Sequence, residues 1–162
     1  MAGRTGVRAT ITSFLTTPQI STVNQVFNTF PKRINFQTNS TAGQMSRAAL
    51  VIFIASENET RLAIGGATNG WKRVDYSIVV QIFHHSLHRA SESAMADFDT
   101  LVDAVKTRLR SDHNFGDPTS SLVWQGAEPV ISATYGEPNT TDLGATETFA
   151  ELQFEVTEMI QA

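Results

Sequence analysis

The spacing of apolar residues predicts two helices. The first, within residues 4–16, has its apolar stripe at Val7, Ile11, Phe14 and Leu15. Pro18 ends it, because proline lacks the amide hydrogen that a helix needs. A longer stripe at about residues 93–111 consists of Ala94, Met95, Phe98, Leu101, Val102, Val105 and Leu109. We therefore expect one long amphipathic helix there, with Ser91 or Ser93 as its cap, and a short N-terminal helix.

Two segments in the middle of the chain read as paired strands. Residues 47–56 form a continuous apolar run, which is typical of a strand covered on both faces. Residues 74–85 alternate instead, and their apolar row is Val74, Tyr76, Ile78, Val80 and Ile82. The connection between the two segments is rich in residues that tolerate a positive φ, namely Gly65, Gly66, Asn69 and Gly70. This order predicts a β-hairpin.

The remaining segments complete an α+β pattern. A strand at 121–137 is broken at Gly126 and Pro129, and a final strand occupies 147–162. In the final strand Leu152, Phe154 and Val156 face one way, and Glu151, Gln153, Glu155 and Thr157 face the other. Residues 20–36 predict an irregular connector with room for one short strand. The polar stretches at 37–46 and 136–147 predict mobile loops. We expect a single domain over residues 1–162, with an antiparallel or mixed sheet covered by the long helix.

Composition narrows the classes of function. The 162 residues suit one domain, and the net charge of -4 argues against a protein that grips nucleic acid. Only 17% of the residues are charged, and such a surface suits packing against other subunits. The chain has no cysteine, no secretory signal-like N-terminus and no apolar run of about 18 residues that would predict a membrane span. We expect it to be made and kept in a cytoplasm-like space.

Three of the four histidines cluster at His84, His85 and His88. If the strand at 74–85 continues through them, His84 and His85 point to opposite faces and cannot bind one metal together. The sequence also offers no carboxylate near them at ligand spacing. The pattern favours histidines that form local hydrogen bonds at a strand exit. A small metal-dependent hydrolase that uses the three histidines is the distant alternative.

Other candidate chemistry is weak. The stretch GGATNGWK lacks the Ser or Thr after lysine that a phosphate-binding loop needs, and it lies between two strands rather than before a helix. Glu151, Glu155 and Glu158 lie on or near one polar strand face, where an acid–base pair is conceivable. A solvated or lumen-facing strand explains them more simply. We therefore predict no enzymatic activity, no cofactor and no metal.

Small basic clusters lie beside aromatic or proline residues. Arg4 and Arg8 belong to the first helix, Lys32 and Arg33 follow Pro31, and Lys72 and Arg73 follow Trp71. Each cluster alone is typical of a solvated surface. Together they are candidate anchors of a subunit or partner interface, because arginine and tryptophan are enriched at binding hot spots.

The order of these segments resembles a known family. Four segments carry the resemblance: VFNTFPKRINF, the buried strand RAALVIFIA, the hairpin GGATNGWKRVDYSIVVQIFHHS and the helix MADFDTLVDAVKTRLRSD. With the two closing strands, they resemble the tail terminator, or tail completion, proteins of long-tailed, non-contractile bacteriophages, particularly those of actinobacterial hosts. The resemblance covers nearly the whole chain, and the hairpin and the following helix are its most specific part.

The resemblance implies a structural virion protein at the head-proximal end of the tail. Such a protein closes into a hexameric ring on the last ring of tail-tube protein, stops tube growth and offers the surface to which the head–tail connector, or stopper, joins. DNA passes through the lumen without specific binding. Glu151 and Glu155 are then candidate lumen-facing acids, which would repel passing DNA. Another head–tail connector, neck or tail-tube ring protein is the nearest alternative.

Overall fold

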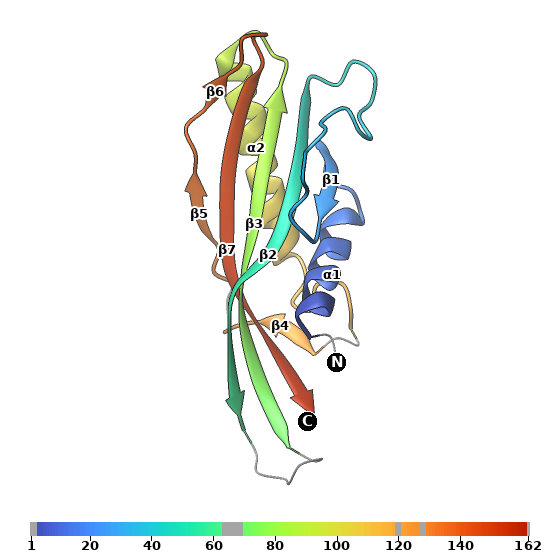
Figure 1. Cartoon of the computed structure of the whole chain (residues 1–162), viewed down its shortest axis with the longest axis vertical. Helices are drawn as coiled ribbons and strands as arrows, with labels where there is room; N and C mark the ends of the chain where they lie inside the picture. The colour runs from blue at the N-terminus through green and yellow to red at the C-terminus, as the bar shows by residue number, and fades with distance from the viewer. Residues whose placement is uncertain (1–2, 63–69, 119–120, 127–128, 162) are drawn as a thin grey trace.

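The fold is α+β, with one mixed sheet and two helices. Figure 1 shows the computed structural model, which describes residues 3–62, 70–118, 121–126 and 129–161. The elements in chain order are α1 (Gly3–Thr16), β1 (Val23–Phe27), β2 (Ser46–Arg61), β3 (Trp71–Ser86), α2 (Ser91–Arg110), β4 (Leu122–Trp124), β5 (Ser132–Tyr135), β6 (Asn139–Thr140) and β7 (Thr146–Gln161). Both helices lie on the same face of the sheet.

Three strands of 16 residues each, β2, β3 and β7, form the body of the sheet. The strand order is β1-β2-β3-β7-β4, and β5 and β6 also pair with β7. β1 runs parallel to β2, whereas the other pairs are antiparallel, so the sheet is mixed. The long strands extend past both helices toward the C terminus, at what we call the distal end of the molecule (Figure 1).

The helices differ from the expectation of one long covering helix. They have 14 and 20 residues, and they share the sheet: α1 packs on β1 and β2, and α2 packs on β3 and β7. The expected serine cap is also wrong. The helix begins at Ser91, so its N-cap is Ala90, whose methyl side chain has no atom that can accept a cap hydrogen bond.

Alternation along the strands separates a helix-covered face from an outer face. The helix-covered row of β3 is buried, as predicted, and it meets the buried stripes of both helices in one hydrophobic core. Members of this core from the final strand are Ala150, Leu152, Phe154, Val156 and Ile160. Aromatic packing fills the space near the end of α2, where Phe115 contacts the rings of Phe14, Trp124 and Phe154.

The predicted strands are present, and β2 and β3 are longer than predicted. The buried segment predicted at 47–56 is the first part of β2, which lies inside the sheet and continues to Arg61 after a bulge between Ile54 and Ser56. A bulge sharpens the twist of a strand pair, and the three long strands twist strongly at this level (Figure 1). The predicted break at Gly126 and Pro129 separates β4 from β5.

The predicted connectors lie partly outside the described residues. Gly65, Gly66 and Asn69 of the hairpin connection fall there, although the pairing of β2 with β3 is described up to Arg61 and Lys72.

The two predicted loops have internal order. Residues 37–46 consist of turns tied to β1, because Asn24 Nδ2 donates to the Asn39 carbonyl and to Gln44 Oε1, both at 3.1 Å. Residues 136–147 contain β6, which pairs with the start of β7. The mobility of both segments stays a prediction.

Candidate functional site

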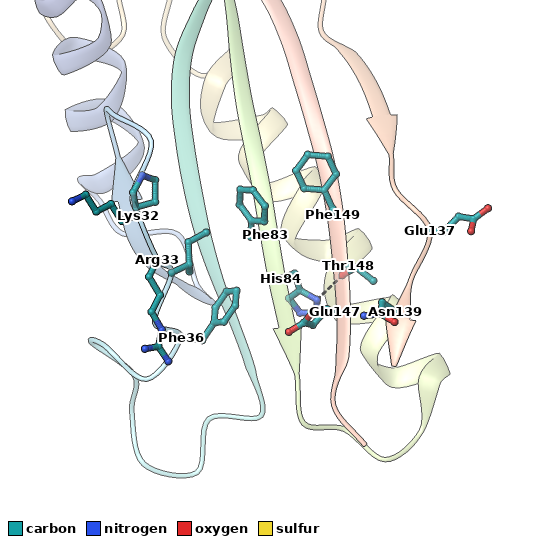
Figure 2. Close-up of a pocket in the computed structure, with 12 residues that line it drawn as sticks. Lys32, Arg33, Phe36, Phe83, His84, Glu137, Asn139, Glu147, Thr148 and Phe149 are labelled. Atoms are coloured by element: carbon teal, nitrogen blue, oxygen red, sulfur yellow. Dashed lines mark hydrogen bonds between the residues drawn. The ribbon is translucent and has the colours of Figure 1, made fainter. Parts of the chain in front are cut away.

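An open groove of about 480 Å³ lies on the outer face of the sheet. Figure 2 shows it between the segment at 31–36 and the segment at 137–139. The rings of Phe83 and Phe149, whose centroids lie 5.1 Å apart, form an apolar floor. The lining residues are Pro31, Lys32, Arg33, Ile34, Phe36, Phe83, His84, Glu137, Asn139, Glu147, Thr148 and Phe149.

The walls of the groove carry opposite charges. Lys32 and Arg33 lie on one side and Glu137 lies on the other, whereas Glu147 lies between them, beside His84 (Figure 2). Lys32 and Arg33 are exposed, and neither makes an ion pair with any residue that the structure describes. These two cations are therefore available to a partner.

One end of the groove continues into a polar row across three strands. Arg47, His85 and Glu147 are direct register partners on β2, β3 and β7. The Phe36 ring stacks on His85 at a centroid distance of 5.2 Å, and His85 Nδ1 lies 3.6 Å from Glu147 Oε1. Arg47 is 7% exposed, and within the described residues its Nε and Nη1 have no hydrogen-bond partner. Buried donors of this kind favour an acceptor supplied from outside the chain.

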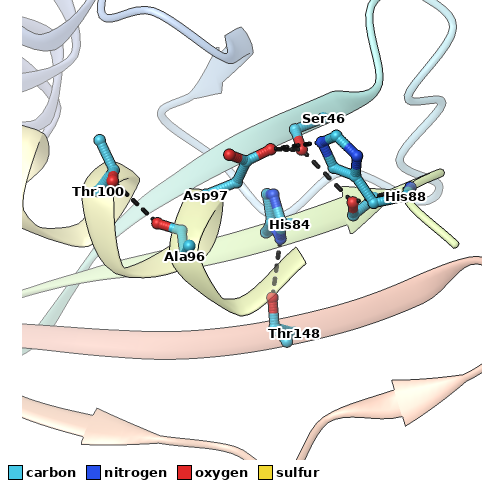
Figure 3. A network of polar contacts seen from close by, with 8 residues as sticks. Ser46, His84, His88, Ala96, Asp97, Thr100 and Thr148 are labelled. Atoms are coloured by element: carbon cyan, nitrogen blue, oxygen red, sulfur yellow. Dashed lines mark hydrogen bonds and ion pairs between the residues drawn. The ribbon is translucent and has the colours of Figure 1, made fainter. Parts of the chain in front are cut away.

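His84 lies on the helix-covered face, opposite to His85, as the alternation predicts. It is 1% exposed, and its Nδ1 is 2.9 Å from Thr148 Oγ1 (Figure 3). Burial lowers the pKa of His84 to about 4, against a smaller opposing effect of the Asp97 carboxylate. The imidazole is therefore neutral at physiological pH. Among the described residues, its Nε2 has no hydrogen-bond partner.

Asp97 on α2 joins the third histidine to β2. Its Oδ2 accepts a hydrogen bond from Ser46 Oγ and lies 3.0 Å from His88 Nε2 (Figure 3). The sequence offers no carboxylate at metal-ligand spacing from the histidines, yet the fold brings the Asp97 carboxylate beside His88. Asp97 is nine residues from His88, and the reversal of the chain between β3 and α2 brings the two together.

This network does not have the order of a hydrolytic triad. A nucleophilic serine needs a histidine base within hydrogen-bond reach, and an acid behind the histidine. Here the carboxylate of Asp97 stands between Ser46 and His88 and accepts from both. Across the described ranges, no group of three His, Asp or Glu side chains could hold a metal ion.

The predicted anchors at the distal end are mostly paired within the chain. Arg4 Nε lies 3.2 Å from Glu57, Lys72 Nζ lies 3.0 Å from Glu59, and Arg73 Nε lies 2.8 Å from Asp75. These pairs join α1 to β2, β2 to β3, and neighbouring positions of β3. Arg8 is half-buried on α1, and Trp71 is 45% exposed.

The predicted acids divide between the two faces. Glu151 and Glu155 lie on the outer face of β7, where Glu151 accepts from Gln81 Nε2 at 3.4 Å. With the Gln125 amide oriented to satisfy both neighbours, its nitrogen donates to Glu155 and its oxygen accepts from Arg73 Nη2 at 3.1 Å. Glu158, which was grouped with these acids, lies on the helix-covered face instead and is 1% exposed. It accepts a hydrogen bond from Tyr76 Oη at 3.3 Å.

Comparisons with known proteins do not assign the chain to a family. No protein-family model matches it, and no curated protein matches its sequence. Neither of the described helices is long and apolar enough to cross a membrane.

Proposed function

We propose that this protein is a structural subunit that closes into a ring on the end of a phage tail tube, stops tube polymerisation and presents a surface to the head–tail connector. The resemblance described above supplies the particular role. The mixed α+β sheet with two helices on one face agrees with the fold that the resemblance implies. Six subunits per ring follow from the resemblance alone.

The observation that supports assembly best is that some of the large apolar side chains left outside the core lie together. The large apolar side chains outside the core are Phe30, Met45, Leu62, Trp71, Leu87, Val130, Tyr135, Leu143 and Met159, each at least 37% exposed. Exposed apolar clusters mark surfaces that other proteins cover. Leu62, Trp71 and Met159 lie together at the distal end. The Leu62 amide donates to the Trp71 carbonyl, and Met159 is the register partner of Arg73, two residues after Trp71 on the same outer face.

The outer face also supports the proposed passage of DNA. Glu151 and Glu155 stand on it in one row, and Gln153 lies exposed between them. If this part of β7 lines the lumen, the carboxylates repel phosphates and DNA slides past without binding. Reversing both charges, with Glu151→Lys and Glu155→Lys, should slow DNA ejection while rings still form. The Glu151→Gln/Glu155→Gln variant removes the charge without reversing it and serves as the matched control. Normal ejection by the lysine variant contradicts the lumen assignment.

Electron microscopy tests the proposed role directly. The purified chain should form closed rings, or a discrete cap at one end of tail tubes, when the two are mixed. A chain that polymerises into tubes by itself is a tail-tube protein, and one that binds only the head is a connector or neck protein. Tails assembled without the chain should grow beyond their normal length, because nothing then stops polymerisation. Tails of normal length without it overturn the proposal.

A further inference from the structure

The turn between β6 and β7 carries an apolar side chain that the described residues leave bare. Leu143 is 97% exposed, the highest value among the large apolar residues. The turn that presents it is well defined: the Thr141 amide donates to the Ala145 carbonyl at 2.8 Å, and the Gly144 amide donates to the Thr141 carbonyl at 2.9 Å. Gly144 supplies the positive φ of 79° that the turn requires. The backbone that carries Leu143 is thus ordered before any partner arrives, which lowers the entropy lost on binding.

Charge and position relate this turn to the groove. Asp142 precedes Leu143, is exposed and makes no ion pair with the residues that the structure describes. Across the groove, the exposed cations Lys32 and Arg33 also make no ion pair within the described ranges. The base of the same β6–β7 hairpin lines the groove through Asn139 and Glu147, whereas the apex extends past it. The Leu143 side chain does not lie in the groove of its own chain, because a side chain packed in the groove would not be 97% exposed.

We propose that the groove binds the β6–β7 turn of a second copy of this chain. Leu143 of one copy packs on the Phe83 and Phe149 floor of the next, and Asp142 lies against Lys32 and Arg33. A volume of about 480 Å³ holds the apex of a turn as well as one leucine side chain. The apolar contact supplies most of the binding free energy, and the exposed ion pairs orient the turn.

Each copy offers one turn and one groove, so the contact is heterologous. A heterologous contact closes into a ring when the rotation between copies permits it, and otherwise extends into a filament. The inference therefore rests on the ring assembly in the proposed function and assigns its lateral contact. It leaves the distal end free for a different partner.

Sedimentation velocity and native mass spectrometry of the full chain test the contact. Leu143→Ser should weaken self-association by roughly tenfold or more, which is the loss expected for one buried leucine. The variant should keep the wild-type circular dichroism and thermal midpoint, since Leu143 touches no core. Val130→Ser is the matched control: it also removes an exposed apolar side chain, at 72% exposure, but away from the groove. Equal association of Leu143→Ser and wild type overturns the contact.

A charge exchange tests the orientation of the turn. Asp142→Lys alone should weaken association by about fivefold, because it places a third cation beside Lys32 and Arg33. Adding Lys32→Glu and Arg33→Glu to the same chain should restore most of it. An unrestored triple variant that is folded overturns the proposed pairing of these charges.

A mixture of two defective copies tests the heterologous geometry. Leu143→Ser lacks a working turn, and Ile34→Glu places a charge in the groove of the other copy. Mixed together, the two should form a 1:1 complex and nothing larger, through the intact turn of one and the intact groove of the other. Higher oligomers in the mixture contradict the proposal.

The outcomes separate this contact from the proposed function. If wild type forms rings and Leu143→Ser forms rings of the same size, the proposed contact is wrong and the proposed tail-capping role still stands. A wild-type chain that stays monomeric at the highest concentration and ignores tail tubes overturns both.

Discussion

Lowering the pH from 7 to 5 should reduce the free energy of unfolding by about 2 kcal/mol through one side chain, His84. Burial holds its pKa at about 4 in the folded chain, against about 6.5 when unfolded. Between these two values the unfolded chain binds a proton that the folded chain does not. The stabilisation is complete above pH 6.5 and is lost progressively as the pH falls toward 4. At pH 5 the unfolded imidazole is almost fully charged and the folded one is about 10% charged, which gives the figure of about 2 kcal/mol.

Urea unfolding at pH 7 and pH 5 measures this effect, with His84→Gln as the variant. The variant should be less stable than wild type at pH 7, because the buried contacts with Thr148 and Phe98 change. The free energy of unfolding that the variant loses between pH 7 and pH 5 should nevertheless be smaller than the wild-type loss by about 2 kcal/mol. His113→Gln is the control, since His113 is exposed, and it should lose as much as wild type. An equal loss in His84→Gln and wild type refutes the reasoning.

Three further predictions follow from contacts inside the fold. Tyr76→Phe should destabilise the fold by about 1–3 kcal/mol in urea unfolding, because Glu158 loses a donor inside the core. Burial, and then the Glu158 charge, raise the pKa of Tyr76 to about 12, so the stability that its phenol contributes should fall between pH 10 and 12 in ultraviolet-monitored titrations of unfolding. Gly116→Ala should lower the thermal midpoint more than Gly126→Ala: both glycines have a positive φ, at 74° and 87°, but only a Cβ at Gly116 meets the Phe14 ring, at 3.2 Å.

Strict alternation predicted the sheet well wherever it was followed. The apolar row of β3 is the buried one, and His84 and His85 fall on opposite faces as the period of two requires. Glu158 shows the opposite case: it was placed with Glu151 and Glu155 by residue type, although an odd spacing from Glu155 puts it on the Leu152 row. Spacing was the better guide.

Long-range pairing explains what the sequence could not predict. The polar residues that follow the bulge in β2 have little strand propensity, yet they pair with β3 because the hairpin register continues through them. The parallel pairing of β1 with β2 depends on α1 and the connector folding onto the sheet. The contacts of Asp97 and Arg47 likewise depend on residues that are distant in the sequence. Asp97 contacts Ser46 across 51 positions of sequence, and Arg47 becomes the register partner of His85, on which Phe36 stacks, only in the folded sheet.

The seven predicted interface residues differ in whether the described residues already pair with them. At the distal end Arg4, Lys72 and Arg73 already have carboxylate partners, and exposed ion pairs of this kind contribute little to binding. A partner at that end would gain more from Trp71 and its apolar neighbours Leu62 and Met159 than from the cations. At the groove the cations add to the apolar contact, because Lys32 and Arg33 make no ion pair with the residues that the structure describes. The two ends thus offer a partner different chemistry: the distal end is mainly apolar, whereas the groove combines an apolar floor with the cations Lys32 and Arg33.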